Sequence, residues 1–238
     1  MDTMAGAEMD TGRQYIGRMI TRMPAGIRFG ASACQVCGRW PGGPVCAPCL
    51  QTFVPPEGHA PSVANGAIST IVTAVDYGYP WDRLITRFKF SGDCGLAPAL
   101  AAVLASAAGL GQLAARCDLV VPIPLSLDRL AQRGYNQSWE LARRLVGWHP
   151  TLRGKGRPLA MTRRGGLPDQ HTLNRRQRLD NLDRAFAVAP QFVKGLRGAH
   201  VMLVDDVVTT GATLQKAAHA LLAAGATSVS AAVLARTP

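Results

Sequence analysis

Apolar runs alternate with amphipathic segments along most of the chain, and this pattern predicts strands separated by helices. The runs richest in β-branched residues are bounded by Gly, Pro or Asp, as strands commonly are. The predicted strands are 69–77, 118–124, 201–204 and 228–235. The predicted helices are one that Asp82 caps, with Leu84, Ile85 and Phe88 on one face, and those at 96–108, 139–146 and 213–224. Such alternation is typical of an α/β domain, in which helices flank a parallel sheet and ligands bind at the carboxyl ends of the strands.

The clearest junction between a strand and a helix lies at 201–214. An apolar run ends in the carboxylates of Asp205 and Asp206, and three residues later a Thr-Thr-Gly-Ala-Thr turn opens an Ala-rich helix. Such a junction directs backbone N–H groups and the positive end of a helix dipole at one place, which suits a phosphate. The carboxylates would repel a phosphate, so we expect their partners to be hydroxyls or a divalent cation, and a phosphorylated sugar offers both. The competing interpretation is a buried strand of a Rossmann-like sheet with a chance acidic end.

Two C-x-x-C knuckles stand near the start of the chain, at Cys34 and Cys37 and at Cys46 and Cys49, with Gly and Pro in the eight residues between them. Four thiolates at this spacing can close a tetrahedral zinc site, and four protein ligands leave no open position, so the site would be structural. A segment this short buries too little apolar surface to fold alone, and a metal would supply the missing stability. Disulfides are the alternative, but the cytoplasm is reducing.

The other two thiols, Cys94 and Cys117, lie in apolar patterns, and we predict that both are buried. Composition divides the chain into four parts. These are a flexible tail (1–30), the cysteine module (31–56), a Pro-rich linker (57–66) and the main domain (67–238).

Positive charge is concentrated in a few segments of this 238-residue chain, whose net charge is +11 and comes mostly from arginine. An anionic partner would explain the charge, and so would the composition of a biased genome. Residues 151–185 hold nine Lys or Arg against three Asp, together with several glycines. This segment suits a loop that closes over an anionic ligand, or a nucleic-acid contact surface. The DNA-contact candidates in it are Arg175, Arg176 and Arg178.

A second basic segment, which contains Gly134, follows the strand predicted at 118–124. Arg129 and Arg133 are four residues apart, so on a helix they would share a face and could converge on a phosphate or diphosphate. A solvated helix face is the alternative. Lys89 is a third candidate for binding the same anion.

No apolar run approaches the 18 or more residues needed to cross a bilayer, and the first thirty residues lack the apolar centre of a signal peptide. The sequence therefore predicts a cytoplasmic protein without membrane insertion.

Residues 201–214 resemble the phosphoribosyl-diphosphate (PRPP) signature of type I phosphoribosyltransferases. Over nearly the whole chain, from Cys34 to Arg236, the sequence is similar to the ComF family, also called competence protein F. The blocks that carry the resemblance are the cysteine knuckles, Lys89-Phe90-Ser91-Gly92, Pro122-Ile123-Pro124-Leu125 with Arg133-Gly134-Tyr135-Asn136-Gln137, and the PRPP loop. A weaker block consists of Gln170, Arg178, Asn181 and Phe186. Two departures are Tyr135, where the family has Phe, and Leu182-Asp183-Arg184, where it has Val-x-Gly.

The resemblance implies a zinc-ribbon module joined to a type I phosphoribosyltransferase fold, a Rossmann-like parallel sheet flanked by helices. It further implies that PRPP binds with Mg²⁺, its ribose held by Asp205 and Asp206. The 5-phosphate would lie in the turn formed by Thr209, Thr210, Gly211, Ala212 and Thr213. The family is associated with DNA uptake and natural transformation. The implied partners are therefore PRPP or a nucleotide-like ligand, single-stranded DNA, and DNA-uptake or helicase and recombination proteins.

Two functions follow, and the sequence leaves both open. The first is a phosphoribosyltransferase that passes ribose phosphate to an unknown acceptor, with Arg129, Arg133 or the basic loop receiving the diphosphate. The second is a non-catalytic DNA-binding or adaptor protein that uses the same fold to sense its ligand.

Overall fold

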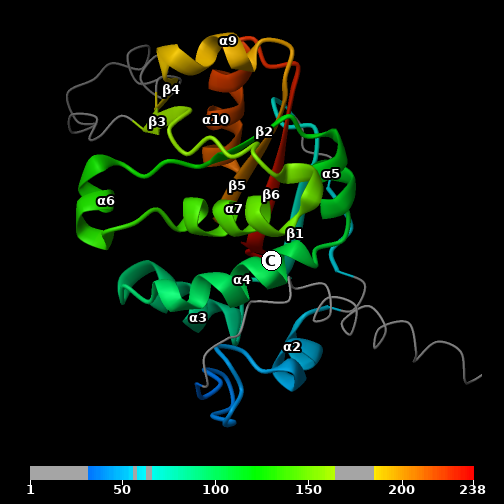
Figure 1. Cartoon of the computed structure of the whole chain (residues 1–238), viewed down its shortest axis with the longest axis vertical. Coiled ribbons are helices and arrows are strands. Elements are labelled where there is room, and N and C mark those ends of the chain that lie inside the picture. Colours follow the sequence, from blue (N-terminus) through cyan, green and yellow to red (C-terminus); the bar gives the residue numbers. More distant parts are fainter. Residues whose placement is uncertain (1–31, 56–57, 63–65, 164–184) are drawn as a thin grey trace, which may run out of the picture.

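The computed structural model describes residues 32–55, 58–62, 66–163 and 185–238, and its centre is a parallel sheet (Figure 1). The sheet has four strands in the order β1-β6-β5-β2, and all neighbouring strands are parallel. The strands are β1 (Ile71–Asp76), β2 (Leu119–Pro122), β5 (His200–Val208) and β6 (Ser228–Arg236). All four predicted strands are therefore present, and the predicted α/β class is confirmed.

Helices cover both faces of this sheet. On one side lie α4 (Ala97–Ala105) and α7 (Gln137–Trp148), and on the other lies α10 (Ala212–Ala223). Side chains of β5 alternate between the two cores, because successive residues of a strand point to opposite faces. Met202 and Val204 pack on the side of α4 and α7, whereas Val201 and Leu203 pack on the side of α10.

Shorter elements connect these layers. The helices are α2 (Ala47–Phe53), α3 (Trp81–Phe90), α5 (Leu110–Arg116), α6 (Leu127–Arg133) and α9 (Val193–Leu196). Short 3-10 turns are η1 (Cys94–Leu96), η2 (Pro150–Leu152) and η3 (Pro190–Phe192). A separate antiparallel pair consists of β3 (Met161–Arg163) and β4 (Phe186–Val188). Neither this pair nor α5 was predicted.

The predicted end of the third strand was wrong. It was placed at Val204, where the apolar run stops, but β5 continues to Val208. The extra residues stay paired with β6, with Asp205 opposite Val233, because the ladder uses backbone groups and does not require apolar side chains. Both carboxylates therefore project from a strand and not from a loop.

Two further expectations about single residues were wrong. Asp82 does not cap α3, because burial of Trp81 (2% exposed) starts the helix one residue earlier, with Pro80 at the cap position. Cys94 is exposed, because it opens η1 just before the buried apolar run that begins at Leu96. Cys117 is buried as predicted.

Residues 1–30 and the DNA-contact candidates Arg175, Arg176 and Arg178 lie outside the described residues. Within the described ranges, no single helix has the length and apolar character needed to cross a membrane. One bent pair of segments, Cys94–Ala105 and Leu110–Arg116, meets at 91° and passes the same test by length and composition alone.

Candidate functional site

The two carboxylates near the end of β5 have partners on two different helices. Ser138, at the start of α7, donates its hydroxyl to Oδ1 of Asp205 at 2.9 Å, and the backbone N–H of Asp206 donates to the same oxygen at 2.9 Å. Lys89, near the end of α3, places Nζ 2.8 Å from Oδ1 of Asp206. Because Asp206 is only 7% exposed, this ion pair is largely shielded from water.

The pKa of Asp205 lies well above the ordinary value for an aspartate. Burial raises its pKa, and the neighbouring charge of Asp206 raises it further. The hydrogen bonds from Ser138 and from the Asp206 N–H oppose this rise, as does the ammonium of Lys89, and the resulting pKa is about 7. A carboxyl group in this range can accept a hydrogen bond when ionised and donate one when protonated, which suits a ligand rich in hydroxyls.

The predicted phosphate turn directly follows the acid pair. Thr209 and Thr210 are exposed, and Gly211 occupies the N-cap position of α10 with φ 74°. That left-handed conformation favours glycine, because a Cβ atom would be strained there. The Ala212 N–H reaches the Thr210 hydroxyl at 3.4 Å, and the first N–H groups of a helix have no partner within the helix itself. The turn, the helix start and the carboxylates therefore share one edge of the sheet.

The arginines predicted to bind an anion both lie on α6, but they contact different groups. Arg133 donates through Nη1 to Oε1 of Gln137 at 3.1 Å, and its guanidinium carbon lies 4.9 Å from the centre of the Phe90 ring. Arg129 is exposed and interacts electrostatically with Arg163. Arg129 therefore reaches the acid pair through Arg163, whose charge interacts with Asp205.

Two residues of this site were not singled out in the sequence. Arg163 ends β3, stacks 5.5 Å from the centre of the Phe186 ring, and interacts with both Asp205 and Arg129. Its pKa is lowered by burial and by the charge of Arg129, against the opposing effect of Asp205. Ser138 is the other, at 3% exposure. Nothing local distinguished Arg163 from the other basic residues of 151–185, whereas Ser138 directly follows the block that carries the family resemblance.

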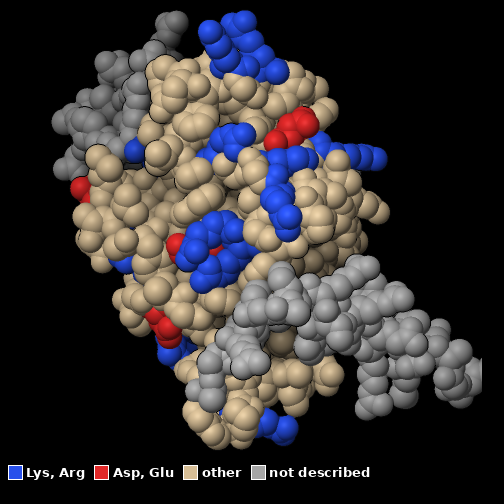
Figure 2. Space-filling view, viewed as in Figure 1, with Lys and Arg blue, Asp and Glu red and all other residues tan. Residues whose placement is uncertain are grey.

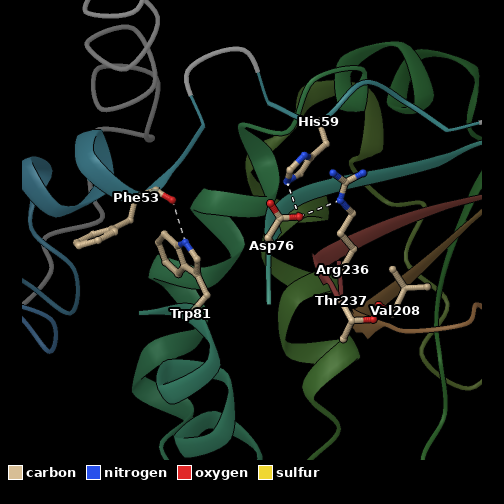
Figure 3. A network of polar contacts seen from close by, with 7 residues as sticks. All are labelled: Phe53, His59, Asp76, Trp81, Val208, Arg236 and Thr237. Atoms are coloured by element: carbon tan, nitrogen blue, oxygen red, sulfur yellow. Dashed lines mark hydrogen bonds and ion pairs between the residues drawn. The ribbon is translucent and has the colours of Figure 1, made fainter. Parts of the chain in front are cut away.

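A second polar network holds the neighbouring strand ends together (Figure 3). Oδ1 of Asp76, at the end of β1, lies 2.9 Å from Nε of Arg236 and 3.3 Å from Nε2 of His59. The Thr237 N–H donates to the carbonyl of Val208 at 2.9 Å. These contacts tie the ends of β1, β5 and β6 to the segment that precedes β1, and so brace the edge on which the acid pair lies.

The four cysteines predicted to bind zinc converge on one point. The sulfur atoms of Cys34, Cys37, Cys46 and Cys49 all lie within 4.8 Å of one another, with separations of 3.8 Å between Cys34 and Cys49 and 3.6 Å between Cys37 and Cys46. A tetrahedron of sulfurs bonded to zinc at about 2.3 Å has edges of about 3.8 Å, so this thiol cluster fits the ion.

The pKa of one of these thiols, Cys34, is lowered. Burial disfavours the thiolate of Cys34, but hydrogen bonds from the backbone of Cys37, Cys46 and Val36 outweigh it and lower the pKa to about 6. A thiolate is the form that binds a metal. Burial raises the pKa of Cys46 and Cys49, so binding of a metal would release protons from these thiols. The cluster could bind zinc with all four ligands supplied by the protein.

Comparisons with known proteins bear on both sites. A family model described as a phosphoribosyl transferase domain matches residues 174–238. The DNA utilization protein YhgH of Escherichia coli (strain K12) is 37% identical over 174 residues, which are 70% of this chain and 72% of that protein. YhgH of Salmonella typhi is 32% identical over 216 residues, with 89% and 87% covered. Competence protein F of Haemophilus influenzae is 32% identical over 145 residues, with 59% and 61% covered.

Proposed function

The chain belongs to the competence protein F (ComF) family, and from this relationship we propose that it binds PRPP or a related sugar phosphate and acts in the uptake or use of DNA. The observation that carries the proposal is the juxtaposition of the Asp205–Asp206 pair with the glycine turn at the start of α10. The names of the relatives, which refer to DNA utilization and competence, supply the cellular context.

Each part of the ligand has a chemically suitable partner. The 5-phosphate would lie in the turn at 209–213, where the N–H groups of the helix start and the threonine hydroxyls can donate to it. The ribose hydroxyls would contact Asp205 and Asp206. The diphosphate would lie toward Arg129 and Arg163, whose charges already interact with each other and with Asp205.

Magnesium would accompany the ligand and offset the charge of its diphosphate. Carboxylate and phosphate oxygens are the donors that Mg²⁺ prefers, and the acid pair belongs to that chemistry. If the protein turns its ligand over, the bond between the anomeric carbon and the diphosphate oxygen breaks as the acceptor bonds to that carbon. The arginines would then stabilise the departing diphosphate.

Titration calorimetry with PRPP and magnesium tests this proposal. We expect wild-type protein to bind and Asp205→Asn to bind at least about tenfold more weakly, because the variant loses a charged acceptor for the ribose hydroxyls. Asp82→Asn is the matched control, since it removes the same charge from the first turn of α3, at the end opposite Lys89, and should leave the affinity for PRPP unchanged. Failure of the wild-type protein to bind, or equal affinity of the two Asn variants, would reject the site.

A non-catalytic role on DNA is the second candidate. The net charge of +11 favours it, and Figure 2 shows basic side chains in several groups on one face, including one over the region of α7. The test is fluorescence anisotropy with labelled single-stranded DNA at increasing salt, where the affinity should fall steeply. Neutralising Arg175, Arg176 and Arg178 should weaken binding and reduce the salt dependence. Diphosphate release from PRPP, measured in parallel with and without DNA, distinguishes a transferase from a ligand-sensing scaffold.

A further inference from the structure

We infer that α3 couples the cysteine module to the acid pair, with Arg87 as the positioning residue through which the metal-loaded module holds Lys89 against Asp206. The described part of the cysteine module, residues 32–55, contains the four thiols and α2. This coupling goes beyond the binding of PRPP, and it can be measured without that ligand.

The module packs against α3 at several points. Oε1 of Gln35 accepts a hydrogen bond from Nη1 of Arg87 at 2.5 Å, and Gln35 lies inside the first knuckle, next to Cys34. Nε1 of Trp81 donates to the carbonyl of Phe53 at 3.0 Å, as Figure 3 shows. The buried thiols and the apolar face of α3 also belong to one hydrophobic cluster, whose members include Cys34, Cys46, Cys49, Trp81, Leu84 and Phe88. The module and the helix therefore form a continuous packed unit.

The same helix reaches the acid pair two residues further on. Lys89 follows Arg87 by about 3 Å along the helix axis, so a small displacement of one is transmitted to the other. The carbonyl of Phe88 accepts a hydrogen bond from the hydroxyl of Tyr135, and Phe90 stacks with Arg133, which fixes this end of α3 to the segment that joins α6 and α7. Lys89 thus lies between the contact of Arg87 with the module and the contacts of Phe88 and Phe90 with the end of α6 and the residues that follow it.

Arg87 has the geometry of a bridge. While Nη1 donates to Gln35, Nη2 donates to Oδ2 of Asp93 at 2.7 Å, in the loop that follows α3. A planar guanidinium can serve two acceptors at a fixed angle, which an ammonium cannot do in the same way. One side chain therefore connects the first knuckle with the loop on the far side of Lys89.

Metal occupancy should act on this bridge through Gln35. The knuckle that carries Gln35 is fixed when Cys34 and Cys37 bind one ion, because so small a segment has little core of its own. Without the ion the thiols no longer constrain the knuckle, so the acceptor for Arg87 is lost. The end of α3 then opens more often, and Lys89 separates from Asp206.

The chain offers a direct readout, since its only lysines are Lys89, Lys155, Lys194 and Lys216. The Lys89 side chain is 20% exposed and ion-paired, whereas Lys194 is exposed. Reaction with an amine-specific acetylating reagent, quantified by mass spectrometry as the ratio of Lys89 to Lys194, therefore reports how often α3 opens. The ratio is compared between zinc-loaded and chelated protein, and between the wild type and the variants Gln35→Ala, Arg87→Ala and Arg87→Lys.

Gln35→Ala is the decisive variant, because it removes the contact of Arg87 with the module and leaves the Arg87–Asp93 pair and the packing of Trp81 and Phe88 intact. We expect it to keep stoichiometric zinc and an unchanged far-UV spectrum. Because the contact between Gln35 and Arg87 is exposed to solvent, the labelling ratio should rise by about two- to fivefold. Arg87→Ala should do at least as much, Arg87→Lys should recover part of the protection, and the effects of Gln35→Ala and Arg87→Ala should not add. The exposed Arg116→Ala is the control and should change nothing.

A labelling ratio that is indifferent to zinc, to Gln35→Ala and to Arg87→Ala would overturn the coupling. If chelation unfolds the whole chain, the test is the comparison of the labelling ratio between zinc-loaded Gln35→Ala and zinc-loaded wild type. PRPP affinity measured on the same samples separates this inference from the proposed function. Protection of Lys89 that depends on the module in a protein that does not bind PRPP supports the coupling and rejects the PRPP site.

Discussion

Replacement of Lys89 by methionine is the most informative single perturbation of the candidate site. It keeps most of the side-chain volume and removes only the ammonium group that lies 2.8 Å from the Asp206 carboxylate. The side chains of Lys89 and Asp206 are 20% and 10% exposed, so water can replace little of the lost interaction. The variant should therefore behave as a protein that holds an unpaired charge in a mostly buried position.

The size of the effect follows from this burial. Exposed ion pairs contribute roughly 0–1 kcal/mol, whereas removal of one partner of a buried pair costs about 3–5 kcal/mol. Because the pair lies at an edge of the sheet, we expect Lys89→Met to lower the free energy of unfolding by about 2–3 kcal/mol, just below the buried range. For a chain of this length that corresponds to a fall in Tm of about 4–12 °C.

Differential scanning calorimetry of zinc-loaded protein measures this change, with the exposed Lys194→Met as the matched control, expected to stay within about 0.5 kcal/mol of the wild type. The double variant Lys89→Met/Asp206→Asn should recover most of the loss, because neither partner then carries a buried charge. The reasoning is refuted if Lys89→Met costs less than about 0.5 kcal/mol, or if adding Asp206→Asn to the Lys89→Met variant brings no recovery.

Four further outcomes are expected. In thermal melts, Asp205→Asn should gain stability relative to the wild type as the pH rises from about 4 to about 7. The pKa of Asp205 rises from 3.8 to about 7 on folding, so the wild type loses the stability of its protonated carboxyl over this range. A difference in Tm between the two proteins that does not vary with pH would contradict the buried environment of Asp205. Ser138→Ala should cost about 1–3 kcal/mol in urea unfolding, because a buried carboxyl loses its donor, and a loss no larger than that of an exposed serine would contradict the contact. Gly211→Ala should lower the free energy of unfolding by about 1–2 kcal/mol, because alanine is strained in the left-handed conformation of Gly211. Gly147→Ala, on the exposed surface of α7, should raise it by up to about 1 kcal/mol, and equal effects of the two variants would argue against the turn. Cys46→Ser should lower the zinc content measured by atomic absorption and destabilise the module, whereas Cys94→Ser, at the exposed thiol, should retain zinc.

Local features of this chain were predictable because their causes are local. The turn at Gly211 and the start of α10 follow from a few adjacent residues that can adopt one backbone conformation. The convergence of the four thiols follows similarly from two knuckles separated by a short, Gly- and Pro-rich segment. The strands were recognised by their apolar residues, but the length of β5 was not, because the pairing of Asp205 with β6 depends on a neighbour far along the chain.

The partners of the acid pair could not be predicted, because they come from helices distant in sequence. A parallel sheet brings the carboxyl ends of its strands to one edge, but helix packing decides which side chains of α3 and α7 reach that edge. Lys89 is a candidate for binding an anionic ligand, and nothing in the sequence indicated that its ammonium would also pair with Asp206. Arg163 was one of nine basic residues in its segment, and its interaction with Asp205 arises from the tertiary fold, in which β3 pairs with β4.

The ion pair between Lys89 and Asp206 resolves a conflict in the sequence, which places two carboxylates next to a turn suited to a phosphate. The ammonium of Lys89 pairs with the carboxylate of Asp206, and burial raises the pKa of Asp205, so the acid pair carries less negative charge than two exposed aspartates would. The arginines Arg129 and Arg163 and the start of α10 can then dominate the local potential and attract an anion. Free phosphate would use only that positive field, whereas a phosphorylated ribose would also use the carboxylates. Lys89→Met should therefore weaken PRPP binding more than Lys194→Met, because it leaves the charge of Asp206 unpaired beside the turn proposed to bind the phosphate.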